Sequence, residues 1–545
     1  MTTKIRQIAM TDKITSTLTS FLQAYRQNDE VFDKESTNRR SELTIAFIVS
    51  LISAVIAITI CSQSSLLYPI NSWVDSNCFF TVGKAMFNGQ VVYRDIYEQK
   101  GILLYFLHGL CTQISNDSFF GVYLLEIAAA TAFLFFSYRI MRLYCGKLCL
   151  CTLPLLATGV YTSISFANGD SAEELCMPLL SFGLWLSLRA IRSKTTLSFG
   201  QSMMIGITSG AVLWIKYTML GIYIGGVIVP VFLMLKSKKI KSFFTFAIGV
   251  LCGVGTITLP FFIYFAVNGA LTDWFTVYFY NNIFLYTGIE SSFITSINAV
   301  FGNFYYNSMF NMGFGIPIII GIVWCILTSF SRVFEKLHIL FCIGVLAFTV
   351  FFRSSAIFYY FFVFSMFAPI GLVPIVRLFE FLLDKICRSI DETVVLGKKG
   401  ILALSLSLTT LFCGFCGLYS YEASPNVYLT KVSKEDMPQY RFAEIINQKE
   451  DATLLNYGWL DGGFYTAANI LPNCKFFCKL NMQKLPEMDE LQNEWINDAK
   501  VDFVVTYCYE LVNPNYKTVA SCDWVDFFGS SATYYLAEKI ENERT

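Results

Sequence analysis

Long apolar segments recur along this chain, and they restrict its possible folds more than any other feature. The first runs from Thr44 to about Ile60, and others follow at intervals as far as about residue 420. About 18 or more consecutive apolar residues are enough for a helix to cross the hydrocarbon core of a bilayer. The sequence therefore predicts a membrane protein that is built from many spanning helices.

The composition agrees with this interpretation. The chain is 55% hydrophobic and only 15% charged, whereas soluble domains average about 25% charged residues. The formal net charge is zero, so nothing in the charge balance indicates nucleic acid as a partner. The first 40 residues or so are polar and carry both signs of charge, so we interpret the first apolar segment as a retained span and not as a cleaved signal peptide.

We expect about eleven spans, which makes the fold class an all-α polytopic bundle. The stretch from 203 to 235 is too long for one span, so we expect a tight hairpin that bends near Trp214 and Tyr217. The expected spans are 44–66, 119–141, 148–166, 175–191, 203–216, 218–235, 243–267, 312–330, 337–352, 356–376 and 400–420.

The short basic connections predict the topology, because loops that are rich in Lys and Arg stay in the cytoplasm. With eleven spans, all of them fall on the side of the N-terminal tail, residues 1–43. They lie at 139–147, 189–194, 236–241, 332–336 and 377–399. The membrane domain, 44–420, then places its first loop, 71–118, outside. The loop after the third span, residues 268–311, Arg353 and the tail, 421–545, follow on the same outer side.

The tail differs in character from the rest of the chain. It contains apolar runs of strand length at 453–457 and 501–507, with an acidic, helix-like segment at 488–500 between them. We predict a small extracytoplasmic α/β domain. Four cysteines of the tail could form one or two disulfides if the tail lies outside the cell; they are Cys474, Cys478, Cys508 and Cys522.

A polar segment follows the first span and includes Asp75. Charged residues beside a membrane span are costly to hold there, so they usually serve chemistry or bind a charged ligand. Asp75 can act as a general base on an acceptor hydroxyl or help to hold a divalent cation. The alternative is that Asp75 caps the helical segment that begins near Phe79.

A second polar group runs from Tyr93 to Lys100 and contains two acids and two cations. Glu98 and Asp95 could serve an acceptor or a metal, and Arg94 and Lys100 could bind a phosphate. We assign Tyr97 of the same segment to substrate binding. The alternative is a solvated loop with local ion pairs, each of which contributes little to stability.

Other polar residues lie near the predicted outer face. Lys216 and Arg353 are isolated cations in apolar surroundings, where their side chains either reach to the interface or bind a lipid phosphate. Ser171 and Asp170 fit a helix cap, and the roles of Glu173 and Glu174 stay open. The two histidines, His108 and His338, are too far apart in the sequence to indicate a histidine metal site.

Taken in order, these features resemble the GT-C superfamily of membrane glycosyltransferases, over roughly residues 44–380. The pattern is Asp75 in the first loop, a helix, and then Gly-x-x-x-Tyr-Arg-Asp-x-Tyr-Glu-x-Lys-Gly-x-Leu-Leu-Tyr, which ends at Tyr105. The protein O-mannosyltransferases and the lipid A aminoarabinose transferases are the most similar groups in pattern. The sequence departs from them at Ser76, where an acid is common, and at Gly101 and Ile102, where prolines are common.

The resemblance implies an enzyme that takes a sugar, a hexosyl or pentosyl group, from a polyprenyl-phosphate carrier. It implies transfer to an acceptor on the outer side of the membrane, with inversion at the anomeric carbon. Asp75 matches the first-loop acid that serves as base, and Glu98 with Lys100 matches a segment near the active site. No cofactor is implied with certainty, and a divalent cation held by Asp75 and Glu98 stays open.

We therefore predict an integral plasma-membrane glycosyltransferase with a cytoplasmic N-terminus. Its partners are the polyprenyl-phosphate sugar, membrane lipids, and an acceptor that is a cell-envelope glycan, a glycolipid or a protein. The alternative is a lipid or sugar transporter or flippase without transfer chemistry, which often contains paired halves. No internal repeat is evident, and Glu126 is the main acid in the middle of a predicted span.

Overall fold

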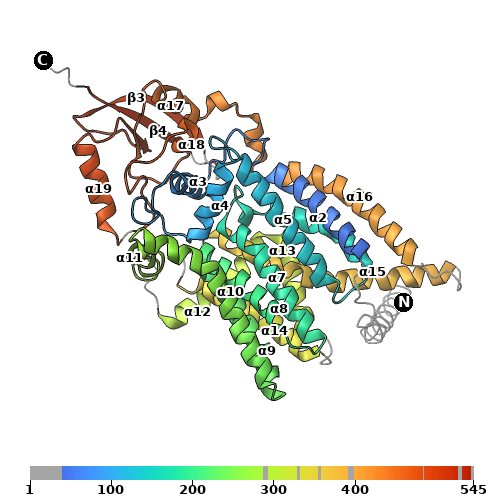
Figure 1. Cartoon of the computed structure of the whole chain (residues 1–545). Coiled ribbons are helices and arrows are strands. Elements are labelled where there is room, and N and C mark those ends of the chain that lie inside the picture. The colour runs from blue at the N-terminus through green and yellow to red at the C-terminus, as the bar shows by residue number, and fades with distance from the viewer. Residues whose placement is uncertain are drawn as a thin grey trace.

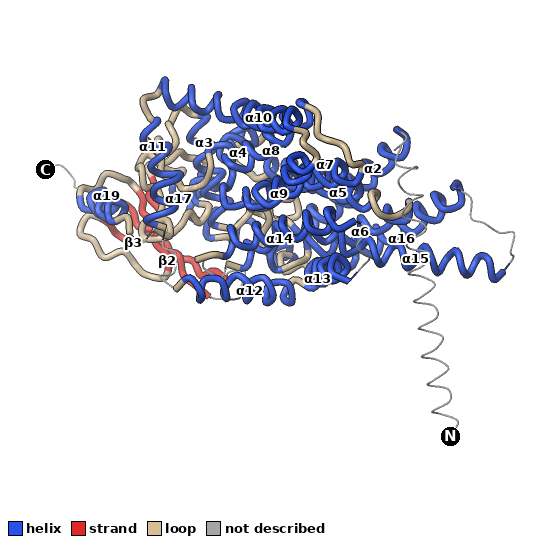
Figure 2. The backbone as a smooth tube through the Cα atoms, turned by 90° about the horizontal axis from the view of Figure 1, so that it is seen from below, coloured by secondary structure: helices blue, strands red, loops and turns tan. Residues whose placement is uncertain are grey.

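The computed structural model describes most of the chain. Its described residues are 40–286, 292–327, 332–353, 357–390, 398–482, 484–525, 529 and 531–541. The predicted N-terminal tail therefore lies almost entirely outside the described residues. A long helical bundle makes up most of the molecule, and a small sheet domain lies at one end of it (Figures 1 and 2).

The bundle is formed by helices that are apolar around most of their surface. Its helices are α2 (Arg40–Cys61), α5 (Phe120–Met141), α6 (Thr152–Tyr161), α7 (Ala172–Arg192), α8 (Phe199–Lys216), α9 (Gly221–Lys236), α10 (Ile240–Val267), α12 (Phe293–Phe310), α13 (Met312–Leu327), α14 (Val333–Phe351), α15 (Ala368–Ile390) and α16 (Lys398–Ala423). Small residues let neighbouring helices approach closely, as is typical in membranes. A Cβ atom on Gly206 of α8 would lie 2.1 Å from the Val250 carbonyl oxygen of α10.

Eight helices in the described part of the chain are long and apolar enough to cross a membrane. The expected count of eleven is therefore not reproduced, and the difference has a clear origin. The expected spans 148–166 and 312–330 fall on shorter apolar helices, Lys147–Tyr161 and Met312–Leu327. The two spans expected within 203–235 form one apolar stretch, Phe199–Lys236.

That stretch is interrupted where the sequence predicted a bend. Lys216 has extended backbone angles, φ −155° and ψ 99°, and a short 3₁₀ turn, η3 (Tyr217–Leu220), leads into α9. Ile205 of α8 and Gly226 of α9 line the same apolar cavity, so the two halves face each other beyond the turn. The bend places Lys216 at the end of α8.

The C-terminal domain contains a four-stranded sheet in the order β1-β2-β4-β3. The strands are β1 (Leu454–Asn456), β2 (Phe503–Tyr507), β3 (Tyr516–Val525) and β4 (Ser531–Lys539). Strands β1 and β2 are parallel, and β4 is antiparallel to both β2 and β3. The helices of this domain are α17 (Pro438–Ile446), α18 (Phe464–Ala468) and α19 (Pro486–Asn497). These elements confirm the predicted small α/β domain, and the four tail cysteines are free in the structure.

The first loop folds into a compact unit between the bundle and the sheet domain (Figure 1). It contains α3 (Val74–Phe87) and α4 (Ile102–Thr112). The backbone N–H of Tyr97 donates to the Lys475 carbonyl at 2.9 Å, and the Asn282 side chain donates to the Gln99 carbonyl at 2.7 Å. The first loop, the 268–311 segment and the tail therefore meet one another, as a common side of the membrane requires.

Candidate active site

Asp75 lies in the first turn of α3, and it is not the cap of that helix. The N-cap position is Trp73, whose side chain makes no capping hydrogen bond. The Tyr359 hydroxyl donates to Asp75 Oδ2 at 3.0 Å, and the Trp73 ring packs edge-on against the Tyr359 ring with centroids 5.0 Å apart. Asp75 is half-buried, which leaves the rest of its carboxylate free for a ligand.

Glu98 and Lys100 lie in the connection between α3 and α4. The Glu98 side chain is 2% exposed, and its Oε2 accepts a hydrogen bond from the Lys100 backbone N–H at 2.8 Å. The Tyr93 hydroxyl donates to the Lys100 carbonyl at 2.7 Å. The backbone N–H and carbonyl of Lys100 are thus both hydrogen-bonded, which fixes the position of its Cα atom.

The charges of Asp75, Glu98 and Lys100 act on one another. Burial raises the pKa of Glu98, the charge and backbone N–H of Lys100 oppose this, and the charge of Asp75 adds to it. Burial alone would lower the pKa of Lys100, but the Asp75 and Glu98 carboxylates outweigh burial and raise that pKa. Lys100 is therefore a firmly charged ammonium that faces two acids.

Gly101 brings Lys100 against the end of α8. Its backbone N–H donates to the Ile215 carbonyl at 3.1 Å, and a Cβ atom at this position would lie 2.0 Å from the Trp214 carbonyl oxygen. Only glycine allows two backbones to come so close. Lys100 directly precedes Gly101, and Lys216 directly follows Ile215. The two lysines, which are far apart in the sequence, therefore belong to chain segments that touch.

Lys216 is held in the same region by an acid and an aromatic ring. It is 9% exposed and forms an ion pair with Glu173, which lies in the first turn of α7. Its Nζ lies 3.9 Å from the centroid of the Tyr360 ring, close enough for a cation–π contact. Glu173, whose role the sequence left open, is thus a neighbour of the candidate site.

Three tyrosines complete the arrangement. Tyr360 and Tyr286 act electrostatically on each other, and both act on Lys100. Tyr359 contacts Asp75, as described above. The sequence did not assign these tyrosines to the site. Tyr359 and Tyr360 follow Arg353, and Tyr286 lies in the aromatic 268–311 segment. Acids, ammoniums and phenols from five chain segments converge here.

Comparison with known proteins identifies the architecture. No family model matches the chain, and no curated protein matches its sequence. Among solved structures, ArnT from Cupriavidus metallidurans in the apo state is similar, with a TM-score of 0.54 and 12% identity over 90% of this chain and 97% of that one. ArnT from the same organism bound to undecaprenyl phosphate gives a TM-score of 0.54 and 12% identity, over 91% and 98%. This chain has the fold of these ArnT structures.

Within this fold, four residues that the sequence assigned to substrate binding make other contacts. Arg94 is exposed, pairs with Asp95 at 2.7 Å and donates to the Asn268 carbonyl at 2.7 Å. The side chain of Asp95 also accepts from the Val91 backbone N–H at 2.8 Å. Arg94 and Asp95 therefore pair with each other within their own loop. This is the local ion pairing given above as the alternative for this segment.

Tyr97 is buried, and its ring packs on Phe476 of the C-terminal domain with centroids 5.0 Å apart. Its hydroxyl accepts from the Asn281 side chain at 3.0 Å. Arg353 is exposed, and its guanidinium carbon lies 5.6 Å from the ring centroid of the neighbouring Phe352. Among the described residues, neither side chain hydrogen bonds to Asp75 or Glu98, although Tyr97 directly precedes Glu98 in the chain and is affected by its charge.

A divalent cation fits this donor set poorly. In the described segments, no group of three or more Asp, Glu, His or Cys residues is arranged to hold a metal ion. At the candidate site, the Lys100 ammonium already faces Asp75 and Glu98. The reaction described below therefore includes no metal ion.

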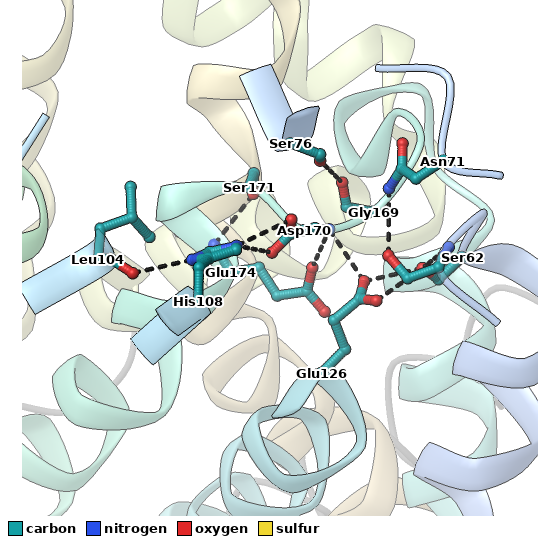
Figure 3. Close-up of polar contacts among 11 residues, drawn as sticks. Ser62, Asn71, Ser76, Leu104, His108, Glu126, Gly169, Asp170, Ser171 and Glu174 are labelled. Atoms are coloured by element: carbon teal, nitrogen blue, oxygen red, sulfur yellow. Dashed lines mark hydrogen bonds and ion pairs between the residues drawn. The ribbon is translucent and has the colours of Figure 1, made fainter. Parts of the chain in front are cut away.

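A second buried polar cluster, which the sequence did not predict, lies beneath the first loop (Figure 3). His108 Nε2 lies 3.0 Å from both carboxylate oxygens of Asp170. The backbone N–H of Asp170 donates to Glu126 at 2.9 Å and to Glu174 at 3.0 Å, and the Ser62 hydroxyl donates to Glu126 at 2.8 Å. All of these side chains are buried. Ser171 caps α7, as expected, but Asp170 pairs with His108 and makes no cap.

Hydrogen bonds to a series of buried carboxyl groups connect the ends of α2, α4, α5 and α7 in this cluster. Gly169 sits against it with φ +88°, and a Cβ atom there would lie 2.4 Å from the Ser62 hydroxyl oxygen. Buried acids this densely packed need partners, because an unpaired buried charge is very costly. Glu126 is thus hydrogen-bonded to Ser62 and Asp170 within this network, whereas Glu174 Oε1 is buried with no hydrogen-bond partner among the described residues.

Proposed function

We propose that this protein is an integral membrane glycosyltransferase that moves a sugar from a polyprenyl-phosphate donor to an acceptor hydroxyl. The observation that carries the proposal is the close contact of Gly101 with Trp214, which brings the segments of Lys100 and Lys216 together. Asp75 acts on Lys100 through its charge, and Tyr359, which donates to Asp75, lies with its ring 5.6 Å from Lys216 Nζ. Two ammoniums near one carboxylate suit a reaction that releases an anion while it deprotonates an alcohol. The GT-C fold, and the binding of undecaprenyl phosphate by one ArnT structure, support this choice of donor.

In the proposed reaction, Asp75 accepts the proton from the acceptor hydroxyl. The acceptor oxygen attacks the anomeric carbon, the bond from that carbon to the phosphate oxygen breaks, and the polyprenyl phosphate leaves with the bonding electrons. The attack comes from the face opposite to the phosphate, so the anomeric configuration is inverted. Because the Tyr359 hydroxyl occupies Asp75 Oδ2, Oδ1 is the oxygen that receives the proton.

The departing phosphate needs positive charge and hydrogen-bond donors. Lys100 supplies a fixed ammonium, and Lys216 supplies a second one that is partly compensated by Glu173. The Tyr286 and Tyr360 hydroxyls lie within the same group of charges. Preorganised donors of this kind lower a barrier by several kcal/mol in a site that excludes water. Glu98 acts by holding Lys100 in place, through its backbone contact and its charge.

The sugar is a hexosyl or pentosyl group, and the acceptor is a cell-envelope glycan, a glycolipid or a protein. We place the reaction on the outer side of the plasma membrane, with the N-terminus in the cytoplasm, because the charge pattern predicts the basic connections on the opposite side from Asp75. The C-terminal domain lies beside the first loop, where an acceptor would approach.

The test uses purified Asp75→Asn protein and a panel of polyprenyl-phosphate sugars. We expect the release of free polyprenyl phosphate to fall by at least about 1,000-fold, because the amide cannot take up a proton. Asp117→Asn, an exposed acid of the same loop, is the matched control and should retain wild-type release. If Asp75→Asn is as active as wild type, Asp75 is not the base. If the wild-type protein moves lipid-linked sugar across vesicles without releasing polyprenyl phosphate, the transporter alternative replaces the proposal.

A further inference from the structure

One face of α3 is buried against the C-terminal domain. The Thr81 hydroxyl donates to Asp461 Oδ2 at 2.7 Å, and the Lys84 ammonium donates to the Asn469 side chain. Asp461 accepts further hydrogen bonds from Asn456 at 3.0 Å and from the Gly463 backbone N–H at 2.9 Å. The contacting residues of α3 recur at helical spacing, so the helix that carries Asp75 is packed along its length on this domain.

Two thiols meet in the middle of this interface. Cys78 Sγ and Cys478 Sγ lie 3.7 Å apart, and each side chain is 1% exposed. Cys78 lies one helical turn after Asp75, and the two cysteines are 400 positions apart in the chain. A disulfide requires a sulfur–sulfur distance of about 2.05 Å. Thiols that already touch can reach that distance by small rotations of their side chains.

We propose that Cys78 and Cys478 are a site of oxidative modification, where a disulfide joins the helix that carries Asp75 to the C-terminal domain. The proposal rests on the placement of the first loop and the tail outside the cytoplasm, which is part of the proposed function. Disulfides form and persist in such oxidising surroundings and are rare in the cytosol.

The reaction is a thiol–disulfide exchange with a protein thiol oxidant. One Cys thiolate attacks a disulfide of the oxidant and releases one of its thiols, and the second Cys thiolate then displaces the other. Two S–H bonds of this chain are lost and one S–S bond forms. The two electrons and two protons reduce the oxidant's disulfide to a pair of thiols.

The burial of the pair indicates when the bond forms. Burial raises the pKa of both thiols above the ordinary value, so the folded interface contains little thiolate, which is the form that reacts. The exchange is therefore fast while the C-terminal domain is still docking and slow afterwards. The same burial keeps reductants from the finished bond, so the link is durable and does not act as a rapid switch.

The chain contains a matched control pair at the other side of the membrane. Cys145 and Cys149 are buried free cysteines whose thiols act electrostatically on each other. Cys145 lies within the basic connection 139–147, which the charge pattern predicts to be cytoplasmic, and Cys149 lies at the start of the span expected from residue 148. These two thiols should stay reduced in the same protein molecule.

The experiment is cysteine mapping on the full chain. Cells are treated with an alkylating reagent before lysis, and the purified protein is denatured in fresh alkylating reagent without reductant, so that buried thiols are labelled as well; it is then digested and analysed by mass spectrometry. We expect one peptide pair, linked through Cys78 and Cys478, which is two hydrogens lighter than the sum of its parts and disappears on reduction. Cys145 and Cys149 should carry the alkyl label. The link should be absent from Cys78→Ser and present in Cys145→Ser.

The wild-type map decides the outcome without relying on any variant that fails to fold. Alkylated Cys78 and Cys478 in the wild-type protein, or a link from Cys478 to another tail cysteine, would overturn the proposal. The map is independent of sugar transfer. A linked protein that releases no polyprenyl phosphate contradicts the proposed function alone, and an active protein with both thiols alkylated contradicts this inference alone.

Discussion

Lys100 shows how one side chain sets the chemistry of a site. Its ammonium faces Asp75 and Glu98, and those two acids raise its pKa although burial acts against the charge. An ammonium is a compact point charge, which suits contact with a phosphate oxygen. The same charge opposes the rise in the pKa of Glu98 that burial and the charge of Asp75 cause.

This residue leads to a prediction about metal removal. We expect sugar transfer to proceed at an unchanged rate after treatment with a strong chelator, because Lys100 already supplies positive charge to Asp75 and Glu98. The measurement is polyprenyl phosphate release with and without chelator, and with added Mg²⁺ or Mn²⁺. A loss of rate that a divalent cation restores would show that a metal takes part.

At the scale of elements, the site is made by the contact of a loop with a helix end. Gly101 touches Trp214 and Ile215 at the last turn of α8. The bend at Lys216 then turns its side chain toward Glu173 at the start of α7 and toward the Tyr360 ring. The two lysines are thus positioned by backbone contact, with little dependence on flexible side chains.

Gly101→Ala tests this contact. The added Cβ would lie 2.0 Å from the Trp214 carbonyl oxygen, so the loop must move and carry Lys100 with it. A displacement of about 1 Å at a catalytic group costs about 100-fold in rate, and we expect polyprenyl phosphate release to fall by about that factor. Gly255→Ala, where a Cβ meets no atom within 4 Å, is the control and should retain full activity. Equal activity of both variants would mean that the Gly101 contact does not position the site.

At the scale of the whole molecule, α3 connects two parts that are distant in sequence. Its first turn carries Asp75 at the candidate site, and its remaining turns are buried on the C-terminal domain around Asp461. Burial raises the pKa of Asp461 to about 6, from an ordinary value of 3.8, although Thr81, Gly463 and Asn456 donate hydrogen bonds to it. The interface therefore contains a carboxyl group that titrates in a mildly acidic range.

The pH dependence of stability follows from this raised pKa. Between about pH 4 and pH 6 the folded protein holds a proton on Asp461 that the unfolded chain has released, so stability falls as the pH rises through this range. The loss is about 3 kcal/mol at most. Asp461→Asn keeps one acceptor oxygen for Asn456 and Gly463, its amide NH2 can donate to the Thr81 hydroxyl oxygen, and it has no charge. We expect the variant to match wild type near pH 4 and to be more stable above about pH 6.

Thermal unfolding of both proteins across this pH range is the measurement, with the difference between their melting temperatures as the readout. A difference that stays constant from pH 4 to pH 7 would show that Asp461 does not titrate in the folded protein. Thr506→Ser, a conservative change at another buried hydroxyl of the sheet domain, is a control that should show no pH-dependent difference.

Some site residues could be found from the sequence because a charged side chain beside a membrane span is energetically costly. Asp75, Glu98 and Lys100 stand beside long apolar runs, where a charge needs a reason. Glu173 was ambiguous, because an acid in the first turn of a helix is stabilised there with or without a ligand. Tyr286 and Tyr360 gave no signal, because aromatic residues are common near membrane interfaces. Arg94 and Asp95 appeared as site candidates, yet they pair with each other.

The sequence by itself determined the fold class, a polytopic helical membrane bundle with a small α/β domain, because apolar length and strand-length runs are local properties. Tertiary structure alone decided the number of long helices and the contacts of Gly101 with Trp214, of His108 with Asp170 and of Cys78 with Cys478. Each of these pairs joins segments whose approach depends on how whole helices pack, and no local pattern of residues records that packing.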